Sequence, residues 1–170
     1  MENLLLILAT SFVLRLSTSK KFRNSFIGNT GCSVLLISDD NFEKTITASG
    51  DELYFYEASD NNVTYGIICV NMKEACAPGM AIDMLEDYIN KLKAPLFILH
   101  HTGIAADADW NSSESRAVTD YWQDSNKVDW KVKGYTNGEC LAVLYVKNIG
   151  QVDVKKQDLF LDSFHFRPAC

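Results

Sequence analysis

Short strand-like segments alternate with clusters of turn residues from Cys32 almost to the end of the chain, and this alternation limits the chain to a sheet-based fold. The segments are rich in Val, Ile, Leu, Tyr and Phe. The nearly continuous apolar run at 63–71 is typical of a central strand buried on both faces. The strand-like segments cover residues 32–38, 44–49, 52–59, 63–71, 96–101, 116–123, 129–136 and 140–148.

Turns and face patterns sharpen this prediction. The sequence SDNN at 59–62 predicts a turn, and Asn137-Gly138 predicts a hairpin because both residue types tolerate positive φ. The last three segments then form a meander. Within 129–136, Trp130 and Val132 alternate with Lys131 and Lys133, so we expect one face of the meander to be wet.

One amphipathic helix is predicted over residues 77–93. Pro78 fits the first helical turn, where its missing N–H is not needed, and Pro95 ends the helix because the residue before a proline avoids α geometry. Polar residues occupy the opposite face. The apolar stripe consists of Ile82, Leu85, Ile89 and Leu92.

The stretch DLFLDSFHF, residues 158–166, predicts a second helix. As a strand it would place polar groups in both apolar rows. As a helix over 155–164 it gathers its large side chains on one stripe, with Asp158 and Asp162 outside it. We expect a short extended tail to follow, with Phe166 returning to the core. The predicted stripe consists of Leu159, Phe160, Ser163 and Phe164.

The chain has the size and composition of one globular domain, with 170 residues of which 47% are hydrophobic. No repeat or linker divides it. The predicted fold class is α+β: residues 20–170 form one domain, an antiparallel sheet of about six strands with one face covered by two amphipathic helices.

Residues 1–19 predict a secretory signal peptide. Leu4–Leu14 is an apolar stretch of signal-peptide length, too short to cross a bilayer as a helix, and small polar residues follow it up to Ser19. Cleavage there predicts a secreted or periplasmic protein. The alternative is a buried first strand or helix, since Glu2 and no Lys or Arg precedes the stretch; the protein is then cytoplasmic with an intact N-terminus.

The charge balance argues against a nucleic-acid partner. The chain has 16 Lys and Arg residues against 22 Asp and Glu residues, a net charge of −6, and its longest basic group is 20–23. Phosphate binding needs clustered cations on one face. We therefore expect a protein or a small ligand as partner, and no stable membrane span.

The five cysteines form no C-x-x-C pair. Cys69 and Cys140 lie in apolar runs, where a free thiol behaves as a small hydrophobe. We expect mostly free thiols; in an exported chain some could pair, and the odd count leaves at least one over. The five are Cys32, Cys69, Cys76, Cys140 and Cys170.

The three histidines predict neither a metal site nor a cofactor site. His100 and His101 are adjacent and would face opposite sides of a strand, and His165 is far away in sequence. No phosphate-binding or dinucleotide-binding motif is present. A small hydrolase that uses His100 or His101 with a carboxylate from the following loop remains an alternative.

Aromatic residues beside the polar loop 102–115 form the predicted interaction surface. Trp110 lies in the loop, and Tyr121 and Trp122 follow in the next strand. Such residues form binding platforms, although a Trp in a meander is often buried. The carboxylates in and after this loop are expected to be solvated: Asp107, Asp109, Glu114 and Asp120.

The sequence WKVKGYTNGECLAVLYV, a polar loop and then DLFLDSF resembles bacterial exported proteins of the PsbP-like α-β-α sandwich type, in which such a hairpin leads to a final helix. The resemblance covers about residues 50–166, and its motifs are structural. It implies an accessory or binding role, as in extrinsic photosystem subunits and a small Ran-binding nuclear import factor. No catalytic motif is carried over.

A second resemblance covers about forty residues. ELYFYEASDNNVTYGIICVN followed by a helix with MLEDYI is similar to longin domains of vesicle trafficking, although the meander departs from the longin order. The favoured hypothesis is an exported, non-enzymatic binding or accessory domain. The alternatives are an intracellular longin-like trafficking adaptor, in which residues 1–19 belong to the core, and the small hydrolase.

Overall fold

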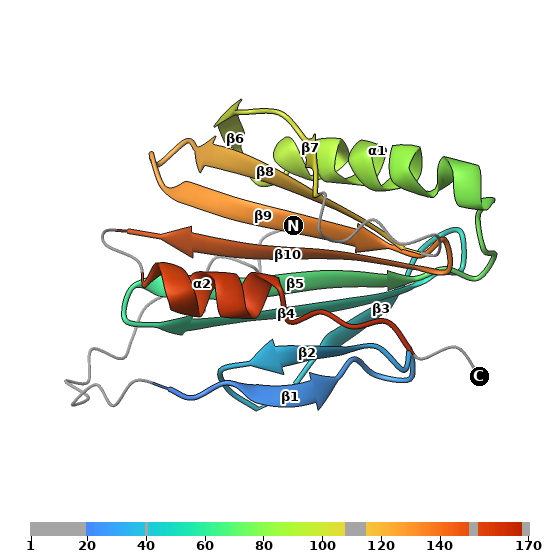
Figure 1. Cartoon of the computed structure of the whole chain (residues 1–170), viewed down its shortest axis with the longest axis horizontal. Helices are drawn as coiled ribbons and strands as arrows, with labels where there is room; N and C mark the ends of the chain where they lie inside the picture. The colour runs from blue at the N-terminus through green and yellow to red at the C-terminus, as the bar shows by residue number, and fades with distance from the viewer. Residues whose placement is uncertain (1–19, 40, 108–114, 150–152, 168–170) are drawn as a thin grey trace, which may run out of the picture.

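The structure is a computed structural model that describes residues 20–39, 41–107, 115–149 and 153–167. The predicted signal peptide, residues 1–19, lies outside the described residues. Ten strands in two antiparallel sheets dominate the described part, together with two α-helices and the short 3-10 helix η1, Pro78–Met80 (Figure 1).

The larger sheet has eight antiparallel strands in the order β3-β4-β5-β10-β9-β8-β6, with β7 also paired to β8. The central strands β5 and β10 are buried along most of their length. The strands are β3 Glu43–Ile46, β4 Glu52–Asp60, β5 Val63–Asn71, β6 Ile98–His101, β7 Ala105–Ala106, β8 Arg116–Asp124, β9 Asp129–Thr136 and β10 Cys140–Asn148.

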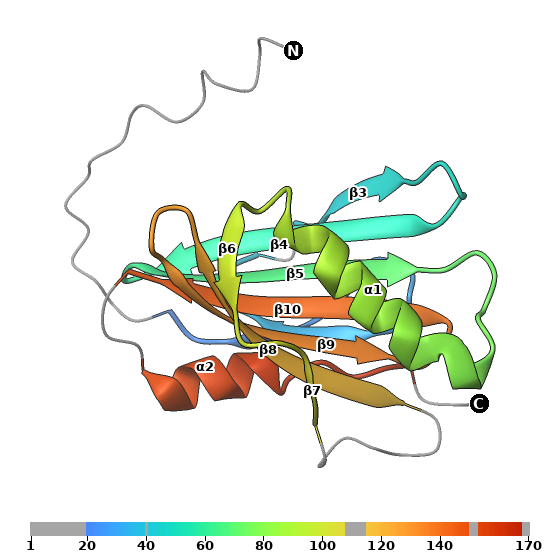
Figure 2. The same cartoon turned by 90° about the horizontal axis from the view of Figure 1, so that it is seen from above.

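Smaller elements cover both faces of this sheet, giving three layers (Figures 1 and 2). Helix α1, Ala81–Lys93, packs on β8 and β9 at one face. On the opposite face lie helix α2, Val154–Leu161, and a two-stranded sheet of β1, Arg23–Phe26, and β2, Ser33–Leu36.

Each face of the larger sheet therefore has its own core. Under α1, Leu85 and Ile89 pack with Trp122 and Trp130 of the sheet. On the other face, side chains from β2 and from α2 and its tail meet the sheet. Fully buried side chains of this core include Tyr65, Tyr135, Phe160, Phe164, Ile27 and Leu36.

The predicted fold class, a six-stranded α+β sandwich of PsbP-like type with both helices on one face, is wrong. The described chain is mostly β, with an eight-stranded and a two-stranded sheet and only two short α-helices, which lie on opposite faces. Two strands gave no apolar alternation to detect: β1 reads RNSF, and β7 has only two residues.

Several local predictions are confirmed. Strand β5 is buried on both faces, and helices α1 and α2 occupy the predicted stretches, although α2 ends at Leu161 instead of residue 164. The β4–β5 turn has both Asn61 and Asn62 at positive φ, 51° and 65°. In the β9–β10 turn, Gly138 takes positive φ, at 87°.

Candidate functional site: a groove between the β1–β2 hairpin and helix α2

The β1–β2 hairpin presents one face to the core and one face outward. Side chains alternate across a strand, so Val34 and Leu36 are buried while their neighbours on β2 point away from the sheet. The register pairs each outward residue of β2 with an outward residue of β1. The outward set is Asn24, Phe26, Ser33 and Leu35.

Helix α2 begins at a side-chain cap. The carboxylate of Asp153 accepts hydrogen bonds from the N–H groups of Lys155, at 3.1 Å, and Lys156, at 3.3 Å. Phe160 and Leu161 fill the core below the helix. The helix therefore lies with its other side along the outward face of the hairpin.

Lysines from β9 fix the acidic side of α2. Lys131 lies 2.8 Å from Asp158, and Lys133 lies 2.6 Å from Asp162 and 2.5 Å from Asp107. Burial alone would lower the pKa of Lys133, but its hydrogen bonds to Asp107 and Asp162 raise that pKa above the ordinary value. The carboxylates beside the groove are thus already neutralised by cations of the protein.

The segment after α2 joins the free edge of β2. The N–H of Ser33 donates to the carbonyl of His165 at 3.0 Å, and the N–H of His165 donates back at 2.9 Å. The hydroxyl of Ser163 accepts from the N–H of Leu35 at 3.1 Å and donates to the carbonyl of Phe160 at 2.6 Å. These hydrogen bonds join the segment 163–165 to β2 and so connect the hairpin to the end of α2.

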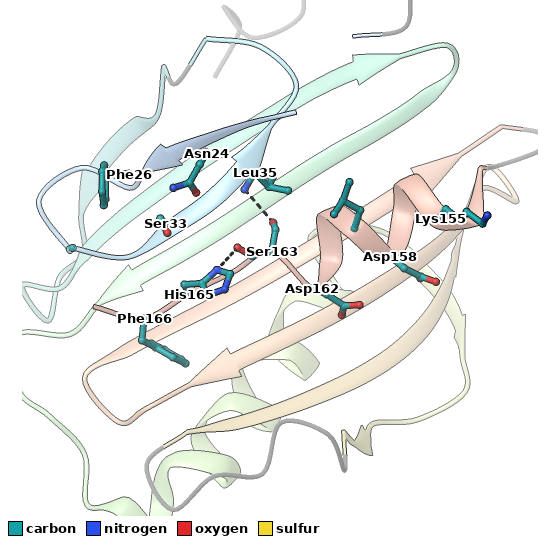
Figure 3. Close-up of a pocket in the computed structure, with 12 residues that line it drawn as sticks. Asn24, Phe26, Ser33, Leu35, Lys155, Asp158, Asp162, Ser163, His165 and Phe166 are labelled. Atoms are coloured by element: carbon teal, nitrogen blue, oxygen red, sulfur yellow. Dashed lines mark hydrogen bonds between the residues drawn. The ribbon is translucent and has the colours of Figure 1, made fainter. Parts of the chain in front are cut away.

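An open groove of about 980 Å³ lies between these elements (Figure 3). Two of its large apolar side chains are strongly exposed, Phe26 at 67% and Leu159 at 54%. Its apolar lining is Phe26, Leu35, Leu159 and Phe166. Its polar lining is Asn24, Ser33, Lys155, Asp158, Asp162, Ser163 and His165.

Ser163 and His165 are polar groups of the groove whose side chains bond to the backbone. A nucleophilic serine needs a base within hydrogen-bond reach of its hydroxyl. The hydroxyl of Ser163 bonds instead to backbone groups, and Nδ1 of His165 lies 2.8 Å from the carbonyl oxygen of Ser163. These two residues do not form a nucleophile–base pair.

Tyr121 and Trp122 of the predicted aromatic surface are neighbours on β8 and differ strongly in exposure. Trp122 is a core residue at 3% exposure, and its indole N–H donates to Asp120 at 2.7 Å. Tyr121, the preceding residue on β8, is exposed and faces the other side, where it lines a polar pocket of about 480 Å³ with Lys131. Trp110 lies outside the described residues.

Two of the carboxylates expected to be solvated are partly or fully buried. Asp120 is 1% exposed and lies 3.0 Å from Lys93, and Asp107 pairs with Lys133. Each has a lysine partner distant in sequence, which local patterns could not show. The other two, Asp109 and Glu114, lie outside the described residues.

His100 and His101 are exposed on β6 and line a shallow pocket of about 280 Å³ with Tyr121 and Asp129. Among the residues that the structure describes, no group of three or more His, Cys, Asp and Glu side chains could hold a metal ion. The hydrolase that would use either histidine stays a hypothesis.

Sequence reasoning missed the two strongly exposed apolar residues that line the groove. Phe26 lies in a polar segment with no strand signal. Leu159 was expected on the buried stripe of α2, and the structure places it outward because Phe160 and Leu161 fill the core instead. The signal that could have shown this is the run of three consecutive apolar residues at 159–161, because one face of a helix cannot bury all three.

No protein-family model and no curated protein matches this chain. The described residues include no helix of the length and apolarity that crossing a membrane requires.

Proposed function

We propose that this chain is an exported, non-enzymatic binding domain, and that its ligand occupies the groove between the β1–β2 hairpin and α2. The observation that carries the proposal is the exposure of Phe26 and Leu159 on the two walls of one groove. Large exposed apolar side chains that line a concave surface are typical of binding sites.

The lining indicates the chemistry of the ligand. A groove of about 980 Å³ lies at the upper end of the range for small-molecule sites. Asp158 and Asp162 are paired with Lys131 and Lys133, so the groove does not demand a cationic ligand. We propose an apolar or aromatic ligand body that packs between Phe26 and Leu159, with polar groups at its ends.

Titration with the apolar dye 8-anilinonaphthalene-1-sulfonate tests the groove. We expect the native full chain to bind the dye, and the double variant Phe26→Ser/Leu159→Ser to bind it at least tenfold more weakly. The control variant Ile46→Ser/Leu99→Ser removes two equally exposed apolar residues on the edge strands β3 and β6. Equal dye binding by native protein and both variants would refute the groove as the site.

The export part of the proposal rests on the apolar stretch Leu4–Leu14 and has its own test. Intact mass and N-terminal sequencing of the protein from fractionated host cells should find a form that begins near Lys20 outside the cytoplasm. An uncleaved chain in the cytoplasm would refute the proposal that the protein is exported and would favour the longin-like adaptor.

A further inference from the structure

Three buried thiols meet in the core between the hairpin and the larger sheet. The sulfur of Cys140 lies 3.4 Å from that of Cys69 and 3.8 Å from that of Cys32. All three residues are at most 4% exposed, and all are free thiols in this structure. Cys140 therefore has two candidate partners for one disulfide bond.

The two pairs differ in how the backbone constrains them. Cys69 and Cys140 lie on the neighbouring strands β5 and β10, but the register pairs Cys69 with Ala142 and Cys140 with Asn71. They are diagonal neighbours, whose Cα atoms in a sheet lie about 7–8 Å apart. A disulfide needs Cα atoms within roughly 6.8 Å, and the ladder of hydrogen bonds opposes the shift that would bring them closer.

Cys32 approaches Cys140 from the other layer. It ends the turn that leads into β2, and no ladder joins it to β10. Its sulfur lies 3.8 Å from that of Cys140, so bond formation requires the turn to move this sulfur to bonding distance. We propose that Cys32 and Cys140 form a disulfide bond under oxidising conditions, that Cys69 stays a thiol beside it, and that the bond links the β1–β2 hairpin to the larger sheet.

The reaction is a thiol–disulfide exchange. One cysteine sulfur attacks a low-molecular-weight disulfide and forms a mixed disulfide, releasing the first small thiol. The second cysteine sulfur attacks this intermediate and releases the second small thiol. Two S–H bonds of the protein are thus replaced by one S–S bond, and the oxidant is reduced to two thiols.

The burial of the thiols determines when the exchange occurs. Contact with Cys140 and then burial raise the pKa of Cys32, so few thiolates exist in the folded protein. We therefore expect the bond to form during folding, before the core closes. Because Gly31 and Ser33 line the groove, the bond would also fix the hairpin wall beside Cys32.

The test uses the full chain with Cys76→Ser and Cys170→Ser, which leaves the three core cysteines. The protein is refolded with oxidised and reduced glutathione, then alkylated in denaturant so that buried thiols react, and weighed. We expect one alkylated thiol in this background and none after adding Cys69→Ala. With Cys32→Ala added instead, we expect two. Three alkylated thiols in the background, or a disulfide that persists in the Cys32→Ala chain, would overturn the assignment.

Two measurements keep the test decisive if a variant fails to fold. Peptide mapping of the unmutated chain after oxidative refolding should find the Cys32–Cys140 peptide pair, and a Cys69–Cys140 pair would refute the proposal. The melting temperature of the background chain should rise by about 10 °C on oxidation and fall back with reductant, because the bond joins residues 108 positions apart. No shift would contradict a link between the layers.

Discussion

At the scale of single residues, Gly66 shows how closely the central strands pack. It pairs with Tyr145 across β5 and β10, and a Cβ at this position would overlap the ring of Tyr145. That ring is buried, and its hydroxyl donates to Glu57 at 2.6 Å, so it has little room to move. The ring of Tyr145 therefore fits only because residue 66 is a glycine and has no side chain.

We predict that Gly66→Ala lowers the free energy of unfolding by about 2–3 kcal/mol, since the extra methyl group overpacks a fixed aromatic ring. Urea denaturation measures this loss. Gly79→Ala is the matched control, because no atom lies within 4 Å of the Cβ position at Gly79, and its effect should stay within about 0.5 kcal/mol. Similar values for the two variants would contradict the packing argument.

A buried ion pair, Asp120 with Lys93, makes stability depend on pH. Burial alone would raise the pKa of Asp120, but hydrogen bonds from Trp122 and Lys93 outweigh burial and hold the pKa below its ordinary value of 3.8. A carboxyl with a depressed folded-state pKa stabilises the protein fully above its unfolded-state pKa. The contribution is then lost as the pH falls below 3.8 through the lower folded-state value.

We predict that Asp120→Asn costs about 2–3 kcal/mol at neutral pH, since it leaves Lys93 without its buried carboxylate partner. The difference from native protein should shrink below pH 3.8, which urea denaturation across a pH series would show. Asp87→Asn breaks the exposed Asp87–Lys91 pair and should change stability by less than about 0.5 kcal/mol. A pH-independent difference for Asp120→Asn would refute the ionic contribution.

At the scale of elements, helix α2 contacts both the larger sheet and the β1–β2 hairpin. Its last carbonyl, that of Leu161, accepts a hydrogen bond from the hydroxyl of Tyr135 on β9 at 2.6 Å. This contact is buried, so loss of the donor leaves a helix-end carbonyl without that partner. The same helix supplies one wall of the groove.

Removing the hydroxyl in Tyr135→Phe should therefore cost about 1–2 kcal/mol and speed hydrogen exchange of the α2 amides. Denaturation and hydrogen-exchange mass spectrometry measure the two effects. Tyr121→Phe, at an exposed site on β8, is the control and should change neither. If both variants exchange like native protein, the bond does not hold α2 in place.

What the sequence could predict also differs by element. Helix α1 and the strands from β4 onward, except the two-residue strand β7, follow from apolar spacing and turn residues, because those signals are local. The burial of Lys133 depends on Asp162, 29 residues away in sequence, and alternation alone placed Lys133 on a wet face. The groove escaped prediction for the same reason, since its walls come from opposite ends of the chain.

At the scale of the whole molecule, the β1–β2 hairpin covers core that was expected to lie under a helix. Phe22, just before β1, packs on Tyr65 and Phe160 with ring centroids 5.5 and 6.0 Å apart. The N-terminal part of the described chain is therefore structural from Phe22 onward. This is where the exported and longin-like hypotheses differ, because the second places residues 1–19 in the core.

Two truncations separate these hypotheses. The ten strands and two α-helices that the structure describes lie between Arg23 and Leu161, so residues 20–170 should unfold within about 1 kcal/mol of the full chain. Deleting residues 1–26 removes Phe22 and β1, leaves the edge of β2 unpaired, and should cost several times more. Urea denaturation followed by circular dichroism measures both. If residues 20–170 fail to fold, the apolar stretch Leu4–Leu14 belongs to the core and the exported binding domain is refuted.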